Sequence, residues 1–283
     1  DPEDDFSITG QTSLNMTYKV RAVLIDSVNE GTIFLKKNNA GGLVGNQDLG
    51  LIKNNINYGL LDCEDGSYIG GIVGLDLANV NNHYAKCCIY GRNYVGGIAG
   101  RGKKLNNNGS LAQIKEATNN VGMIMGGLIG DELAENSEDI NSNYYLYGGY
   151  GAIDNISYGG KAYPISYDEL KNLDIVDDLK KINIYFVNDK ECILKETIEY
   201  GDSLPLSKVP YIDEKDNDYA LWDGLSDGVL NNVTRELLFK CDFNDVYPSI
   251  SSSEEPLAYV VADGKFFMGD SLSCMVEAKD SNE

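Results

Sequence analysis

The sequence predicts a mainly β chain in which a parallel β-solenoid is followed by a small β-grasp-like α+β domain. Three observations lead to this fold class. A glycine-rich pentapeptide recurs, short apolar runs are interrupted by Gly and Asn, and the pattern changes near residue 160. Recurrence of this kind is the signature of stacked repeats, whose apolar faces become buried only against neighbouring repeats.

The recurring pentapeptide gives the solenoid its period. It reads Gly-Gly-Leu-Val-Gly from Gly41, Gly-Gly-Ile-Val-Gly from Gly70, Gly-Gly-Ile-Ala-Gly from Gly96 and Gly-Gly-Leu-Ile-Gly from Gly126, with spacings of 29, 26 and 30 residues. At about 3.3 Å per residue, a turn of this length holds two or three short strands. We expect four to five turns within residues 1–160, with glycines at close backbone approaches and at corners of positive φ.

Between the glycine motifs, an apolar residue is followed by an Asn cluster and then by a Tyr or Gly. These segments begin at Ile52, Val80, Leu105 and Ile140. Asn tolerates the left-handed region and forms side-chain ladders between equivalent corners, so we interpret the clusters as scaffold. A ligand-binding surface is the alternative interpretation.

These glycine cores and Asn-rich segments together resemble the GLUG repeat of large secreted bacterial proteins, which include adhesins and the non-catalytic parts of IgA peptidases. The resemblance covers roughly residues 30–150. It implies a parallel β-solenoid.

The pattern becomes helical after residue 160. Ser166 is followed three residues later by Glu169, which is the spacing of a capping box, and an apolar stripe then begins at Leu170. We expect a helix over 167–180 within a capping or linker segment, residues 161–181.

Residues 182–248 predict a second module. The segment 182–187 alternates as a strand, a second strand runs over 193–200, and the sole tryptophan, Trp222, follows. These features resemble the Listeria-Bacteroides type of repeat, the internalin B-repeat class. The resemblance implies a small β-grasp-like unit that serves as a spacer or interaction module. We interpret Trp222 as a core residue rather than as a ligand platform.

The remaining residues, 249–283, predict a β-hairpin and an acidic tail. The strands 257–262 and 265–268 flank an Asp263-Gly264 turn of the kind that favours type I′. The tail runs from Glu277 to Glu283.

Charge and composition exclude several classes of function. The formal charge of −21 repels phosphate backbones, so we expect no nucleic-acid partner, and no apolar stretch is long enough for a transmembrane segment. The six cysteines form no Cys-x-x-Cys pair and are interpreted mostly as small buried residues, with a Cys192–Cys241 bridge left open.

The sequence contains few groups that could act in catalysis. His83 is the only histidine and is interpreted as a solvated or packed residue of a repeat, and the glycine motifs do not match nucleotide-binding loops. The acids Asp48, Asp62, Glu64 and Asp76 are assigned to solvated turns, and the run 213–218 is interpreted as a solvated loop rather than a calcium site. We expect no enzyme activity, no cofactor and no catalytic, cofactor-binding or metal-ligating residue.

The sequence therefore predicts a secreted, extracellular bacterial protein of the cell surface or cell wall, which acts in adhesion and binding or as a structural spacer. Its expected partner is a host or envelope glycan or protein. The alternative is a non-catalytic ancillary region of a larger secreted peptidase or glycan-degrading enzyme.

Overall fold

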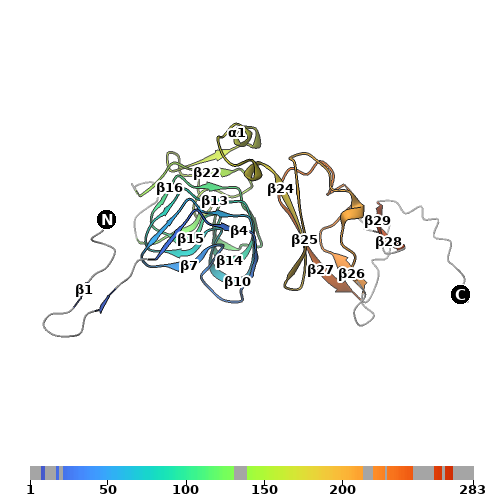
Figure 1. The fold of residues 1–283 in the computed structure, drawn as a ribbon, viewed down its shortest axis with the longest axis horizontal. Coiled ribbons are helices and arrows are strands. Elements are labelled where there is room, and N and C mark those ends of the chain that lie inside the picture. The colour runs from blue at the N-terminus through green and yellow to red at the C-terminus, as the bar shows by residue number, and fades with distance from the viewer. Residues whose placement is uncertain are drawn as a thin grey trace, which may run out of the picture. The chain divides into compact units, whose positions relative to one another are not determined.

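The computed structural model describes residues 22–130, 139–212, 219–226 and 228–244, and the backbone of residues 8–9, 17–18, 258–262 and 265–269 (Figure 1). The chain divides into two compact units, Asp1–Leu179 and Lys180–Glu283. The first unit contains a parallel β-solenoid of about four turns, which confirms the predicted architecture.

Four parallel sheets form the faces of the solenoid, numbered here in the order in which each turn passes through them. Face 1 contains β3 (Val23–Ile25), β8 (Leu51–Lys53), β12 (Val80–Asn81), β16 (Leu105–Asn106) and β21 (Ile140–Asn141). Face 2 contains β4 (Val28–Asn29), β9 (Ile56–Asn57), β13 (Tyr84–Ala85), β17 (Gly109–Ser110), β22 (Asn143–Leu146) and β23 (Ala162–Ile165). Face 3 contains β5 (Thr32–Phe34), β6 (Ala40–Gly41), β10 (Leu60–Gly70), β14 (Cys88–Gly96), β18 (Gln113–Lys115) and β19 (Asn119–Gly122). Face 4 contains β7 (Val44–Gln47), β11 (Val73–Asp76), β15 (Ala99–Gly102) and β20 (Met125–Leu128).

The core consists of apolar residues that stack in register from turn to turn. Ile52, Val80, Leu105 and Ile140 are paired along face 1, and all are buried. Since each residue contacts its counterparts above and below, a turn buries its apolar side chains only when its neighbours are present.

Strand pairing corrects the position of the fourth glycine repeat. Gly41, Gly70, Gly96 and Gly122 are paired with one another along face 3. The fourth repeat therefore begins at Gly122, with the sequence Gly-Met-Ile-Met-Gly, and the prediction that it begins at Gly126 was wrong. Gly126 is the last residue of that repeat, because Met125 pairs with Ala99.

Close packing explains the motif glycines. A Cβ on Gly70 would lie 2.0 Å from the carbonyl oxygen of Val73, and one on Gly96 would lie 1.8 Å from that of Ala99. No glycine of the first three motifs has a positive φ. The expected role at close approaches is confirmed. The left-handed corners that recur from turn to turn are occupied by other residues, most often Asn, rather than by the motif glycines.

A short helix follows the last solenoid strand. The capping box is confirmed, since the Ser166 side chain accepts from the backbone N–H of Glu169, and the Glu169 carboxylate accepts from the backbone N–H of Ser166. The helix is shorter than predicted: α1 spans Tyr167–Lys171, and a separate 3-10 helix, η3, spans Asp177–Lys180. Asn172 ends α1 by donating its side-chain amide to the Asp168 carbonyl.

The second unit contains a four-stranded mixed sheet in the order β25–β24–β27–β26. The strands are β24 (Ile182–Asn188), β25 (Glu191–Ile198), β26 (Tyr219–Trp222) and β27 (Leu237–Asn244), with the 3-10 helix η4 at Leu206–Lys208. The central pair, β24 and β27, is parallel, and both outer pairs are antiparallel.

Trp222 lies in the core of this sheet, as predicted. Its ring meets Phe186 edge-on at 5.1 Å between centroids, and its indole N–H donates to the Pro210 carbonyl at 2.9 Å. Phe186 also stacks on Phe239 at 5.0 Å. Three aromatic rings therefore anchor the unit.

Two further hairpins complete the described strands. The predicted C-terminal hairpin is formed by β28 (Ala258–Ala262) and β29 (Lys265–Gly269), and β1 (Ile8–Thr9) pairs with β2 (Thr17–Tyr18). The Asp263-Gly264 turn, the run 213–218 and the acidic tail lie outside the described residues.

The interpretation of the cysteines as buried residues is confirmed for three of the five described ones. Cys63, Cys87 and Cys88 are fully buried in the solenoid, whereas Cys192 and Cys241 are half-buried. Both of the latter are free thiols, on strands β25 and β27 at either side of β24, so they form no bridge.

Candidate functional site

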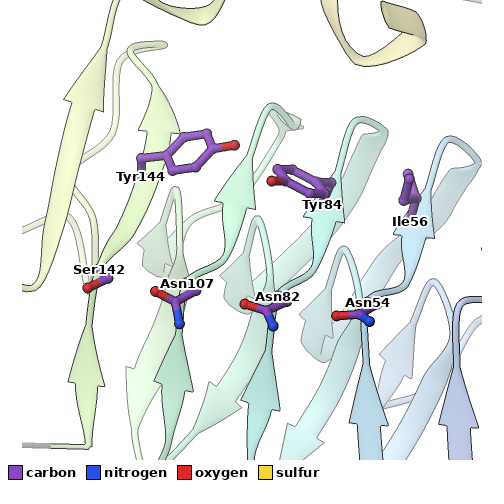
Figure 2. Close-up of a pocket in the computed structure, with 7 residues that line it drawn as sticks. All are labelled: Asn54, Ile56, Asn82, Tyr84, Asn107, Ser142 and Tyr144. Atoms are coloured by element: carbon purple, nitrogen blue, oxygen red, sulfur yellow. The ribbon is translucent and has the colours of Figure 1, made fainter. Parts of the chain in front are cut away.

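The candidate site is a groove along the corner between faces 1 and 2. It is lined by Asn54, Ile56, Asn82, Tyr84, Asn107, Ser142 and Tyr144, and it has a volume of about 440 Å³. Figure 2 shows these residues in two rows that run from turn to turn. One row carries amide and hydroxyl groups, and the other carries apolar and aromatic side chains.

The polar row is set by backbone conformation. Asn54, Asn82, Asn107 and Ser142 directly follow the face 1 strands and have φ values of 55°, 57°, 56° and 54°. Asn is among the residues that adopt this left-handed conformation most readily, which explains its recurrence. Because all four residues share one conformation, their side chains leave the corner in the same direction (Figure 2).

The next residue of each turn lies inside the solenoid and forms a hydrogen-bonded ladder. Asn108 accepts from the backbone N–H of His83 at 3.0 Å, and Asn143 accepts from that of Asn108 at 3.0 Å. The side-chain amides of Asn108 and Asn143 donate to the carbonyls of Val80 and Leu105. Each turn is thereby tied to the one before it, which fixes the spacing of the groove residues outside.

His83 is one residue of this ladder. Its Nδ1 accepts from the backbone N–H of Asn55 at 3.2 Å, and its side chain is fully buried. Burial lowers the pKa of His83 to about 4, although the backbone groups of Ile52 and Asn55 partly oppose this. Of the two sequence interpretations, the packed one is correct. The imidazole is neutral at neutral pH and faces away from the groove.

The aromatic row depends on a glycine. Gly109 lies between Tyr84 and Tyr144 on face 2, and a Cβ there would lie 2.7 Å from Cζ of Tyr144 and 2.8 Å from Cδ1 of Tyr84. The two rings therefore converge over Gly109, with centroids 6.3 Å apart and an interplanar angle of 56°. Figure 2 shows the two side chains turned toward each other.

The Tyr144 hydroxyl is buried and has no hydrogen-bond partner of acceptable geometry among the described residues, although Tyr84 lies beside it. Burial, with the neighbouring Tyr84 side chain, raises the pKa of Tyr144 above its ordinary value. The phenol is therefore protonated and uncharged at neutral pH.

A second left-handed corner lies between two segments of face 3, and in two of its turns it is occupied by Tyr rather than by Asn. Tyr68 and Tyr94 have φ values of 61° and 51°, and their rings stack at 5.1 Å. The Arg101 guanidinium lies 5.3 Å from the centre of the Tyr94 ring. These side chains pack against one another, so we assign the candidate site to the Asn and Tyr rows instead.

The acids that were interpreted as solvated turn residues lie in different environments. Asp48 is exposed, whereas Asp62 and Glu64 belong to strand β10. Asp76 is fully buried, so its assignment to a solvated turn was wrong. It ends β11 and accepts from the backbone N–H of Ala78, while burial raises its pKa to about 6.

Sequence reasoning did not identify the groove. The recurring Asn segments indicate the corner. The Tyr that follows the first segment, Tyr58, is not the counterpart of Tyr84, because strand pairing places Ile56 beside Tyr84. The converging rings become visible only once Gly109 and Tyr144 are placed in register.

Together the fold and the groove define the class of structure: a parallel β-solenoid with an uncharged, aromatic-walled groove along one corner. Comparison with protein families, with characterised proteins and with solved structures finds no significant match. Within the described ranges, no helix is long and apolar enough to cross a membrane.

Proposed function

We propose that this chain is a non-catalytic binding part of a secreted bacterial cell-surface protein, and that the groove is where it binds its ligand. The observation that carries the proposal is the composition of the groove. Its seven residues supply amide, hydroxyl and aromatic groups, and its only titratable groups are the phenols of Tyr84 and Tyr144. Such a surface orients a ligand through hydrogen bonds and ring contacts.

The residues that line the groove give little support to a catalytic function. General acid-base catalysis at neutral pH favours a group whose pKa lies near 7, and the pKa of Tyr144 is raised far from that range. The single imidazole is held inside the ladder at His83, on the opposite side of the corner backbone from the groove.

The fold also supports the role of a surface protein. The stacked turns form a rigid scaffold that displays the same corner repeatedly, and the aligned glycine motifs support the resemblance to the GLUG repeat. In the second unit, a parallel central pair flanked by antiparallel strands supports the resemblance to a β-grasp-like spacer module.

A binding screen tests the proposal. The purified chain and its Tyr84→Ala/Tyr144→Ala variant are applied to arrays of bacterial and host glycans and of matrix proteins. We expect ligands that bind the parent chain and not the variant, with unchanged circular dichroism and no cleavage of the bound ligand. Binding that is unaffected by the double substitution, or turnover of a ligand, would contradict the proposal.

A further inference from the structure

We propose that the groove takes a neutral, linear oligosaccharide that lies along the solenoid axis. This inference rests on the proposed binding function and adds the ligand class and its direction. It follows from the geometry of the two rows, from the charge of their surroundings and from the pairing of the corner backbone.

The geometry favours an extended ligand. Equivalent residues of neighbouring turns are separated by one strand spacing, about 4.8 Å, so four turns present polar groups over roughly 14 Å. The polar row runs from Asn54 to Ser142, and the apolar row beside it contains Ile56, Tyr84 and Tyr144 (Figure 2). A ligand that contacts both rows needs apolar surface on one side and hydrogen-bonding groups on the other, repeated along its length. A chain of sugar rings has both.

The polar row is accessible. Asn54, Asn107 and Ser142 are exposed, and Asn82 is half-exposed. An Asn side chain offers both a donor and an acceptor, which suits a ligand hydroxyl that needs both. Tyr84 and Tyr144 are half-buried and supply the apolar wall against which a sugar ring can pack.

The charges exclude an anionic ligand. None of the seven lining residues carries a formal charge at neutral pH, whereas the whole chain has a net charge of −21. An acidic sugar would meet no cation in the groove and would approach against the field of the chain. A neutral ligand meets neither penalty.

The backbone argues against an extended peptide. Peptides that add to a sheet use unpaired backbone groups at its edge. Here the corner N–H groups of Asn54, Asn82 and Asn107 donate to the carbonyls of Asn81, Asn106 and Asn141 in the next turn. The groove therefore offers side-chain groups for recognition and no strand edge for addition.

Titration calorimetry with oligosaccharides of equal length tests the ligand class. The probes are cellohexaose, chitohexaose, mannohexaose and hexagalacturonate, with a neutral hexapeptide as the alternative class. We expect at least one neutral hexasaccharide to bind tenfold or more tightly than both hexagalacturonate and the peptide. We also expect its affinity to fall as the chain is shortened from six sugars to two.

Matched variants test the location. Tyr144→Ala and Asn107→Gly should each weaken binding of that hexasaccharide by about tenfold, because each removes a lining side chain, and glycine preserves the left-handed corner. The controls are Tyr211→Ala, an exposed tyrosine of the second unit, and Asn39→Gly at the left-handed corner of face 3. The controls should leave binding within twofold of the parent chain.

The outcomes separate the two proposals. If hexagalacturonate or the peptide binds best and the groove variants abolish that binding, the ligand class is wrong while the binding function stands. If none of the probes and none of the array ligands binds in the groove, both proposals fail. Equal loss of binding in groove and control variants would also overturn the assignment to this groove.

Discussion

Replacing His83 by Asn should remove a large acid sensitivity from the solenoid. Equivalent positions in the neighbouring turns are Asn55 and Asn108, whose side-chain oxygens accept backbone N–H groups as Nδ1 of His83 does. An Asn at position 83 can therefore accept from the backbone N–H of Asn55. Unlike imidazole, its amide does not titrate.

The magnitude follows from the pKa of His83, which is about 4 in the folded chain and 6.5 at its ordinary value. The folded state binds a proton less readily than the unfolded chain, so the stabilisation is complete above pH 6.5 and is lost as the pH falls towards 4. Between pH 7.5 and pH 4.5, this one group should cost the parent chain about 2.5 kcal/mol of unfolding free energy. Protonation of Nδ1 would also place two donors face to face at Asn55.

Denaturant unfolding at the two pH values measures the effect in the parent chain and in His83→Asn. We expect the variant to differ from the parent by less than about 1 kcal/mol at pH 7.5, and to lose about 2.5 kcal/mol less than the parent on acidification. Any cavity left by the smaller side chain contributes equally at both pH values. Since His83 is the only histidine, its NMR titration reports the folded pKa directly. A measured pKa near 6.5, or identical pH dependence of the two proteins, would show that His83 does not cause the acid sensitivity.

Three other predictions concern the scaffold. Asp76 should give a pH dependence of stability opposite to that of His83. Its pKa is about 6 in the folded chain and 3.8 at its ordinary value, so its contribution to stability is lost as the pH rises. In the same unfolding assay, the parent chain should lose about 2 kcal/mol of unfolding free energy through Asp76 between pH 4.5 and pH 7.5, and Asp76→Asn should abolish this loss. Gly96→Ala should destabilise the chain by about 3 kcal/mol or more, because the new Cβ would overlap the Ala99 carbonyl. Gly159→Ala, where no atom of the described residues lies within 4 Å of the new Cβ, is the control and should change thermal stability by less than about 0.5 kcal/mol. In a Cys274→Ser background, a thiol reagent should label two half-buried cysteines in the native chain and three further, fully buried ones only after unfolding; labelling of the buried three under native conditions would contradict the structure.

The period and class of the fold could be predicted because the solenoid imposes the same requirements on each turn. Gly70 and Gly96 meet backbone of the following turn, and Ile52 and Val80 stack in register, so the same residue types recur in the sequence. The fourth repeat was misplaced because Met123 stands where the earlier turns have a second glycine. A Gly-Gly pair occurs four residues later, and only the hydrogen bonds between turns distinguish the two alignments.

The candidate site was harder to predict because its residues obey weaker local rules. Ile56, Tyr84, Gly109 and Tyr144 share one position on face 2, yet they have no common residue type. Similarly, the burial of Asp76 depends on the corner that closes over it, and a carboxylate at a turn is normally solvated. Both features depend on neighbours from other turns, which a single sequence does not place.

Fold stability and groove chemistry are carried by adjacent residues with different constraints. At the inner position, Asn55, Asn108 and Asn143 are fully buried and must provide an acceptor and a donor to the preceding turn. An acid at this position would lose the donor and bury a charge, at a cost of several kcal/mol. The outer position needs only a residue that tolerates positive φ, and Asp26 and Ser142 already stand there in the first and last turns. Substitution of the outer Asn residues by Asp can therefore change the charge of the groove while the ladder beneath it keeps its hydrogen bonds.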